Sequence, residues 1–439
     1  MQPVKCWYSI DDRLGARWLA YIGVISLLLY AALQFVLPNT QEVMERVLAF
    51  SGLVAFCVYG KGLRKAPLLL LLGFLCVQLF SWSLGLWQYP QWAIDDPRLQ
   101  DLAKLFIFIS VAWWLNGSTR NTLIVWGLAV GGVLITTLLA PGDDGWLTGF
   151  TGERVGFGIR NNQHASMLFG VSLLGLLCFA RRFWSDGNAR YLRIALWCLA
   201  MVMVVTGIAV GQTRAVWLSA TIASGIGLIL WIIKSVLEGR TRHLTKYLVT
   251  ISLSIVIGAG VLVSTLGDSL NHRFHKESSV ISQLVDGEIT EVPYTSIGIR
   301  INSWIAASQW IAERPMTGWG PEGRQLVMSE TTWLPDWVLA KYGHLHNYFL
   351  ETWVEYGIIG LVAMSLLAFW IGRATWLAWR GNAMPDDIAC FGLMFFIYWM
   401  IISNFESYNS FPTGLFVHNL IVGGLITHYW RWRLSHQTA

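Results

Sequence analysis

The sequence predicts an all-α protein whose helices cross a membrane about twelve times. Of its 439 residues, 55% are hydrophobic and only 13% are charged, whereas an ordinary soluble domain has roughly 25% charged residues. A spanning helix takes about 20 apolar residues, so the apolar content suffices for about twelve. Runs such as Ala66–Leu79 are apolar on every face, which disfavours membrane β-strands because these alternate in polarity. These observations exclude a soluble globular enzyme and a disordered chain.

Twelve apolar segments follow one another along the chain. The chain has 25 tryptophans, many of them at segment ends, as expected of aromatic side chains at a membrane–water interface. The first segment is long enough to span and lacks a small-residue cleavage site, so we interpret it as a spanning helix and not as a signal peptide. The predicted spans are 17–37, 43–60, 66–86, 99–115, 121–141, 163–181, 191–211, 214–234, 246–266, 346–371, 386–403 and 412–431.

Lys and Arg are distributed unevenly between the loops, and this distribution predicts the orientation of the helices. With the N-terminus in the cytoplasm, 19 of the 31 Lys and Arg fall on the cytoplasmic side. Six fall on the outer side outside residues 267–345, and long loops such as that one cross the membrane whatever their charge. We therefore expect both termini to face the cytoplasm.

Residues 267–345 form the one long connection, which the topology assigns to the outer face. A structureless loop of this length is unusual unless it is functional. Within it, residues 299–311 have an approximately helical apolar repeat, Pro315 ends the pattern, and Gly318–Pro321 indicates a tight turn. The sequence thus predicts three parts, which are spans one to nine in 1–266, a loop region with helices in 267–345, and the last three spans in 346–439.

Charge and cysteines favour neither nucleic acid nor metal as a partner. The net charge of +5 is explained by basic loops that set the topology, which leaves membrane lipids as the partner expected from composition. The six cysteines lack metal-ligand spacing. The outer face has no Asp-x-Asp motif, and the acidic pairs Asp95-Asp96 and Asp143-Asp144 are interpreted as solvated loop charges. We expect no metal and no cofactor.

Three arginines on the predicted outer face are candidates for binding phosphate. Arg160 precedes the span at 163–181, Arg214 lies in the short turn between two spans, and Arg300 begins the amphipathic segment of the long loop. A guanidinium group donates two parallel hydrogen bonds to phosphate oxygens and stays charged. An isoprenoid diphosphate, whose tail stays in lipid, would fit such arginines. The alternative is an interfacial anchor that contacts lipid headgroups, and the tight turn makes this least favoured for Arg214.

His346 is the candidate general base, because it stands where an apolar run begins. A helix N-terminus disfavours imidazolium, which leaves a neutral ring able to accept a proton near pH 7. His344 ranks lower, since two residues along a helix it would point elsewhere. Glu406, in the short outer loop 403–411, is a candidate for orienting a histidine or an arginine. Before any resemblance is considered, a capping histidine and an exposed turn acid are the favoured interpretations of His346 and Glu406.

Three stretches of the sequence resemble the O-antigen ligase and O-antigen polymerase superfamily of bacterial membrane glycosyltransferases. His346-Asn347, nine residues and Gly357-Ile358-Ile359-Gly360 match the family pattern of His-Asn, nine residues and Gly-x-x-Gly. Residues 300–320, from Arg300 through Trp304 to Arg314-Pro315-Met316-Thr317-Gly318-Trp319-Gly320, are similar to its Arg…Trp…Pro-x-x-Gly-x-Gly segment. Thr213-Arg214-Ala215 looks like its arginine turn between two spans. The likeness covers about residues 150–371.

The resemblance implies a GT-C-like glycosyltransferase in the inner membrane of a Gram-negative bacterium. It implies an O-antigen ligase of lipopolysaccharide biosynthesis, which moves polysaccharide from undecaprenyl diphosphate to the lipid A-core on the periplasmic face, inverting the anomeric carbon without metal. In that family, residues matching His346 are proposed as the base, and those matching Arg214 and Arg300 as diphosphate ligands. Arg160 is our extension, and Asn347, His344 and Glu406 are secondary candidates.

Three other activities compete with this interpretation. An O-antigen polymerase uses the same donor with another lipid-linked repeat as acceptor, and a protein O-oligosaccharyltransferase shares the same His-Asn element. A polytopic transporter is the alternative from a different class. Transporters place charged residues near the middle of the bilayer, often in repeated halves, whereas here the notable charges are predicted at the outer surface. The sequence does not assign the sugars, the linkage or the oligomeric state.

Overall fold

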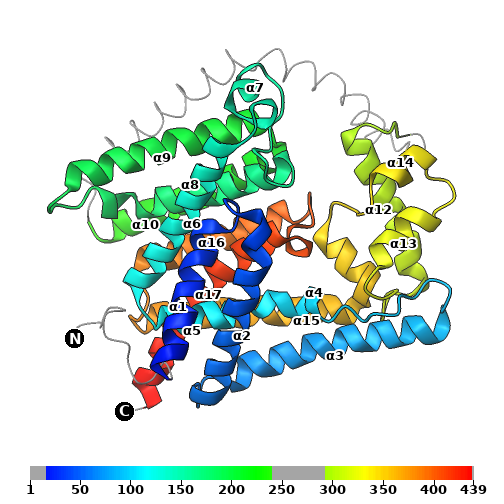
Figure 1. Cartoon of the computed structure of the whole chain (residues 1–439), viewed down its shortest axis with the longest axis horizontal. Coiled ribbons are helices and arrows are strands. Elements are labelled where there is room, and N and C mark those ends of the chain that lie inside the picture. The colour runs from blue at the N-terminus through cyan, green and yellow to red at the C-terminus, as the bar shows by residue number, and fades with distance from the viewer. Residues whose placement is uncertain (1–15, 240–291, 438–439) are drawn as a thin grey trace. The chain divides into compact units, whose positions relative to one another are not determined.

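The computed structural model describes residues 16–239 and 292–437 (Figure 1). The predicted span 246–266 and the first part of segment 267–345 lie outside these residues. The regular elements of the described residues are all helices: α1 Arg17–Leu33, α2 Gln41–Tyr59, α3 Lys65–Gln88, α4 Gln100–Ala103, α5 Phe108–Leu115, α6 Thr119–Leu139, α7 Trp146–Phe150, α8 Asn162–Phe183, α9 Arg190–Gly211, α10 Arg214–Leu237, α12 Ser296–Glu313, α13 Gly323–Glu330, α14 Asp336–Lys341, α15 Tyr348–Arg380, α16 Asp386–Ile402, α17 Pro412–Gln437, and short 3-10 turns η2 Pro38–Thr40, η3 Lys104–Phe106, η4 Gly142–Asp144 and η7 Tyr408–Ser410.

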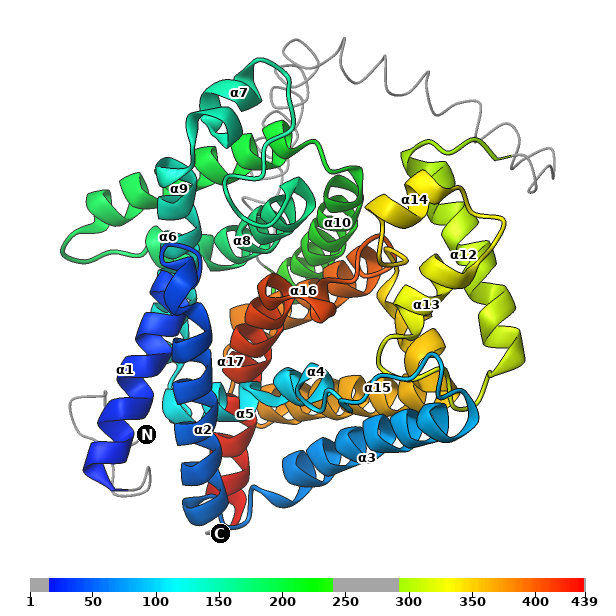
Figure 2. The ribbon, with the colours of Figure 1, turned by 45° about the vertical axis from the view of Figure 1, so that its right-hand side comes forward.

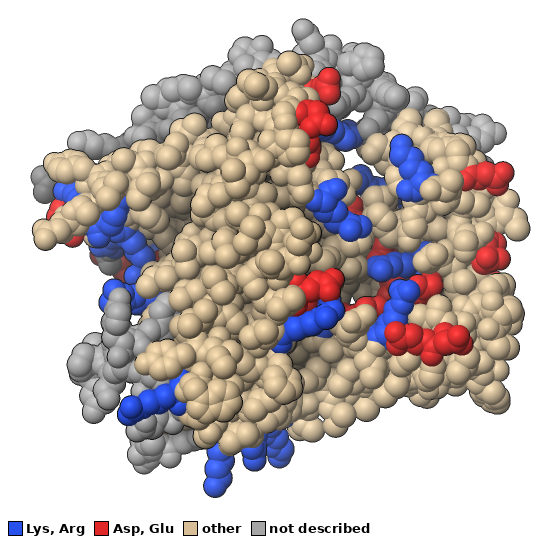
Figure 3. Space-filling model, in the orientation of Figure 1, with Lys and Arg blue, Asp and Glu red and all other residues tan. Residues whose placement is uncertain are grey.

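The lengths and composition of these helices are those of a multi-pass membrane protein. Among the described residues, six helices are long and apolar enough to cross a membrane, namely α3, α6, α8, α9, α10 and α15. Large apolar side chains such as Phe50, Leu138 and Phe369 are exposed on helices, and Figure 3 shows broad surfaces without Lys, Arg, Asp or Glu. Such surfaces are expected where helices face lipid. The count of twelve spans and the division at residues 266 and 345 stay predictions.

The predicted span 99–115 is a broken helix and not a single one. It consists of α4, η3 and α5, and side chains of α17 hold the backbone where the helix breaks. Asn419 accepts a hydrogen bond from Phe108 N (2.8 Å) and donates one to Lys104 O (2.9 Å). His418 Nε2 lies 3.1 Å from Leu105 O. Backbone groups released from a helix must find other partners in an apolar environment, and these side chains supply them.

The described residues group into two compact units. The first contains the described residues within Met1–Leu139, Ala306–Leu393 and Ser403–Ala439, and the second contains those within Ala140–Ile305 and Met394–Ile402. In the first unit, every residue of α5 is buried, and α1, α2 and α17 pack around this helix. In the same unit, α15 lies alongside α3 (Figure 2) and also packs against α17 and α13.

In the second unit, α8 is the central helix, against which α9 and α10 pack (Figure 1). A side chain at Gly211 would approach Ser166 Oγ to 2.2 Å, so glycine permits the close contact between α9 and α8. Small residues at helix contacts are typical of membrane proteins, because they let backbones approach. The close packing fixes the start of α10 beside the first turns of α8.

Candidate active site

Two histidines converge on one buried carboxylate in the first unit. His346 Nδ1 lies 2.9 Å from Glu406 Oε2, and His344 Nε2 lies 3.0 Å from Glu406 Oε1. The centroids of the two imidazole rings are 4.0 Å apart. An ionised carboxylate only accepts hydrogen bonds, so both ring nitrogens donate to it. The secondary candidates His344 and Glu406 therefore form one cluster with His346.

The backbone before α15 brings both histidines to the same side. Asn347 is the N-cap residue, and its side chain accepts hydrogen bonds from Phe349 N and Leu350 N. His346 has a left-handed backbone conformation, with φ of 52°. The expectation that His344 points away from His346 assumed helical geometry and is wrong, because residues 344–346 precede the helix.

The segment that follows α16 carries Glu406 to this position. Tyr348 N donates a hydrogen bond to Ser403 O (2.9 Å), which joins the first turn of α15 to the end of the α16 segment. Glu406 is 1% exposed and also accepts a hydrogen bond from Ser407 N (3.1 Å). The interpretation of Glu406 as an exposed turn acid is therefore excluded.

The hydrogen bonds around Glu406 keep this carboxyl group ionised. Burial raises the pKa of Glu406, but hydrogen bonds from His344 and His346 outweigh burial and hold that pKa well below its ordinary range. With Nδ1–H of His346 donated to the carboxylate, a neutral ring carries its lone pair on Nε2. Nε2 of His346 can then accept a proton, which is the property required of a general base.

The same three residues offer a donor set that suits a metal ion. The nitrogen and oxygen atoms of His344, His346 and Glu406 all lie within 4.8 Å of one another. Two imidazoles and a carboxylate are a donor set used by Zn²⁺ and by non-haem Fe²⁺. Metal binding would require lone pairs from the ring nitrogens that here donate to Glu406. The arrangement fits a hydrogen-bonded acid–base cluster better than a ligand sphere.

The glycines of the two longer motifs have a structural role at a kink in α15. Gly357 interrupts the helix with φ of 65° and ψ of −165°, a conformation essentially restricted to glycine. At the kink, Trp319 N and Gly320 N donate to Val354 O (2.8 Å) and Glu355 O (2.9 Å). In return, Ile358 N donates to Pro315 O (2.9 Å). The Pro-x-x-Gly-x-Gly and Gly-x-x-Gly motifs therefore pair backbone to backbone.

Trp310 and Trp319 help to form this contact. Trp319 is buried, its Nε1–H donates to Trp310 O (2.9 Å), and the two rings lie 4.7 Å apart. The Arg314 guanidinium covers the rings of Tyr89 and Trp319, at 4.8 and 5.3 Å from their centroids. Trp310 and Trp319 therefore belong to an aromatic cluster that packs the segment.

The three candidate arginines lie in the second unit, around the first turn of α8. Arg160 precedes Asn161, the N-cap residue of α8, and has a φ of 37°. Arg300 Nη2 lies 3.4 Å from Gln163 Oε1 in the first turn of α8. Arg160 is exposed and Arg300 is half-buried.

Arg214 is the first residue of α10 and is exposed. The preceding Thr213 binds the side chain of Ser166 on α8 through its hydroxyl (2.9 Å), and Gln212 donates from Nε2 to Gly152 O (2.9 Å). These two hydrogen bonds fix the turn that precedes Arg214, and its short length predicted such a fixed position. Helix N-termini favour anions, so the position suits a phosphate ligand.

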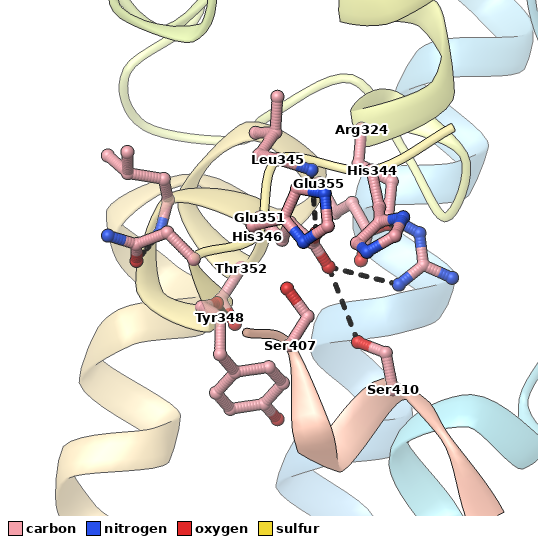
Figure 4. Close-up of polar contacts among 12 residues, drawn as sticks. Arg324, His344, Leu345, His346, Tyr348, Glu351, Thr352, Glu355, Ser407 and Ser410 are labelled. Atoms are coloured by element: carbon pink, nitrogen blue, oxygen red, sulfur yellow. Dashed lines mark hydrogen bonds and ion pairs between the residues drawn. The ribbon is translucent and has the colours of Figure 1, made fainter. Parts of the chain in front are cut away.

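Sequence reasoning missed two residues next to the histidine cluster. Glu351 and Glu355 of α15 are buried and contact Arg324 of α13 (Figure 4). The signal for them was present, since acidic residues four apart in an otherwise apolar helix share one helix face, and buried charges require partners. Their basic partner was not predictable, because it comes from a different helix.

Part of the chain is similar in sequence to known proteins. Residues 199–365 match the family model described as O-antigen ligase. A stretch of 179 residues is 25% identical to an uncharacterized protein of Haemophilus influenzae (strain ATCC 51907 / DSM 11121 / KW20 / Rd). That similarity covers 38% of this chain and 40% of the relative, so the chain matches about two fifths of the relative's length. Residues 199–365 are therefore similar to the O-antigen ligase family.

Proposed function

We propose that this protein transfers a glycan from undecaprenyl diphosphate to the lipid A-core oligosaccharide at the periplasmic face of the inner membrane. The family supports an O-antigen ligase or polymerase type of activity, and the apolar helices support a membrane location. The observation that carries the catalytic assignment is the hydrogen bond between His346 and the buried Glu406 (2.9 Å). The proposed topology keeps both termini in the cytoplasm.

In the proposed reaction, His346 Nε2 removes the proton of the acceptor hydroxyl group. The hydroxyl oxygen attacks the anomeric carbon of the donor, and the bond from that carbon to the diphosphate oxygen breaks with inversion. The diphosphate leaves with the bonding electrons, and Arg214, Arg300 and Arg160 stabilise its charge. Glu406 orients the imidazole and stabilises the imidazolium that forms. The energy of transfer lies in the glycosyl–diphosphate bond, so the reaction needs no nucleotide sugar. In this proposal the arginines stabilise the leaving diphosphate, and no metal or cofactor takes part.

Purified protein with a polyprenyl-diphosphate glycan and lipid A-core tests this proposal. We expect the lipid A-core to be extended, and we expect His346→Ala to abolish transfer although the protein still inserts into the membrane. His436→Ala is the control, because His436 is exposed near the end of α17. Full transfer by His346→Ala would overturn the base assignment. Extension of a second lipid-linked repeat, or of a protein, would instead indicate a polymerase or a protein O-oligosaccharyltransferase.

A further inference from the structure

Glu351 is a buried acid that reaches back to the segment bearing the two histidines. It lies in the first turn of α15 and is 1% exposed. Its Oε1 atom accepts a hydrogen bond from Leu345 N (2.9 Å), the peptide N–H group between His344 and His346. Figure 4 shows the side chain of Glu351 directed at this segment.

The histidine segment depends on side chains to hold its backbone. Residues 343–347 precede α15 and are outside regular helix. The Asn347 side chain binds amides that follow it, so it fixes the start of α15 and not the residues before it. The Leu345 N–H group is buried with its residue, and a buried amide without an acceptor would be costly. Glu351 supplies the acceptor.

The second oxygen of Glu351 ties this segment to two others. Oε2 accepts a hydrogen bond from Arg324 Nη1 of α13 (3.1 Å) and one from Ser410 Oγ of η7 (3.4 Å). Ser410 lies four residues after Glu406. Burial disfavours the charged guanidinium, but the charges of Glu355 and Glu351 outweigh burial and raise the pKa of Arg324. One carboxylate therefore connects the histidines, the segment of Glu406 and α13.

Glu355 provides an internal comparison in the same helix. It lies one turn after Glu351, is also buried, and its Oε1 atom is 3.4 Å from Nε of the same Arg324. Among the described residues, its side chain is not hydrogen-bonded to residues 344–346. The two acids thus share burial, helix and basic partner, and differ in the hydrogen bonds that Glu351 accepts from Leu345 N and Ser410 Oγ.

We propose that Glu351 is a positioning residue, which holds the backbone between His344 and His346 so that the His346 ring stays against Glu406. This inference rests on the proposed function, in which His346 is the general base. The hydrogen bond to Leu345 performs this role, and the charge of Glu351 does not. A shift of about 1 Å in a reacting group costs about 100-fold in rate, so the effect is measurable in turnover.

Two substitutions at Glu351 separate the hydrogen bond from the charge. Glu351→Gln keeps an oxygen at the same reach and removes the charge, and we expect kcat within about threefold of wild type, a difference that corresponds to less than 1 kcal/mol. Glu351→Asp keeps the charge and withdraws the oxygen by one methylene group. We expect it to lower kcat by about 10–100-fold with both KM values unchanged.

The pH profile distinguishes positioning from a structural role. In Glu351→Asp, the acid limb of the kcat profile is expected to move to lower pH, since a displaced His346 loses the carboxylate that favours its protonated form. Glu355→Gln and Glu355→Asp are the matched controls, and their kcat and acid limb should equal those of wild type. A structural role would lower the amount of folded enzyme without moving the limb.

Two outcomes would overturn the inference. The first is Glu351→Asp with the kcat and acid limb of wild type, and the second is Glu351→Gln more impaired than Glu351→Asp, which would assign the role to charge. His346→Ala is measured alongside. If His346→Ala keeps full transfer, the proposed function fails, whereas an inactive His346→Ala with unaffected Glu351→Asp rejects the positioning role alone.

Discussion

Gly357→Ala places a methyl group at the kink of α15, where the structure leaves no room for it. The new Cβ atom would lie 2.2 Å from the backbone carbon and oxygen of Met316 and 2.4 Å from Thr317 N. These are backbone atoms, so relief requires the segment 315–320 to move away from α15. Alanine would also have to adopt the backbone conformation of Gly357, with φ of 65°.

The cost of this substitution follows from strain and from lost hydrogen bonds. A non-glycine residue in this region of backbone space costs about 1–3 kcal/mol. Moving the segment also weakens the bonds from Trp319 N, Gly320 N and Ile358 N, which are 2.8, 2.9 and 2.9 Å long. Each such bond contributes about 0.5–1.5 kcal/mol net. We therefore expect Gly357→Ala to destabilise the protein by about 3–7 kcal/mol.

Thermal unfolding of the detergent-solubilised protein measures this effect. We expect the midpoint to fall by about 3–8 °C. Gly372→Ala is the matched control, because Gly372 lies in the same helix and a Cβ atom there would meet nothing within 4 Å. Alanine is the better helix former by about 1 kcal/mol, so this control should be neutral or stabilising. Equal midpoints for the two variants would refute the role assigned to the kink.

Four further predictions concern the candidate site. Glu406→Gln should lower kcat by about 10–100-fold, because an amide stabilises imidazolium less well than a carboxylate; unchanged turnover would contradict its role. Because the pKa of Glu406 is lowered in the folded protein, its carboxylate stabilises the fold at pH values above the ordinary pKa of about 4.3. This stabilisation is lost as the pH falls, so wild type should lose more stability on acidification than Glu406→Gln. Equal acid sensitivity in unfolding measurements would refute that expectation. Arg214→Lys should raise the KM for the diphosphate donor, since lysine keeps the charge but not the two-pronged geometry, and an unchanged donor KM would remove Arg214 from the donor site. Chelator should leave transfer intact, whereas inhibition reversed by a divalent ion would show that the cluster of His344, His346 and Glu406 works as a metal centre.

Local features of the sequence were sufficient to predict most of the long helices that the structure describes, although the span predicted at 99–115 is broken. Apolar runs flanked by polar residues locate these long helices, because each run must be buried in lipid or against another helix. The helical repeat at 299–311 corresponds to α12, and the start of α15 follows the His-Asn pair as predicted. The motifs that carry the family resemblance include Gly357 and residues 315–320, which meet at the kink of α15.

Which of these residues contact one another was decided by tertiary structure. The break between Lys104 and Phe108 depends on Asn419, about 310 residues away in the chain. The orientation of His344 depends on a non-helical turn, in which Leu345 N donates to Glu351 and both histidines contact Glu406. The hydrogen bond from Leu345 N to Glu351 could not be predicted, because the sequence does not show which group a buried acid in an apolar run binds. An apolar pattern is a property of one helix and can be recognised in its own residues. A hydrogen bond between helices depends on how they pack. For this reason the sequence predicted the helices, and only the tertiary structure showed which residues pair.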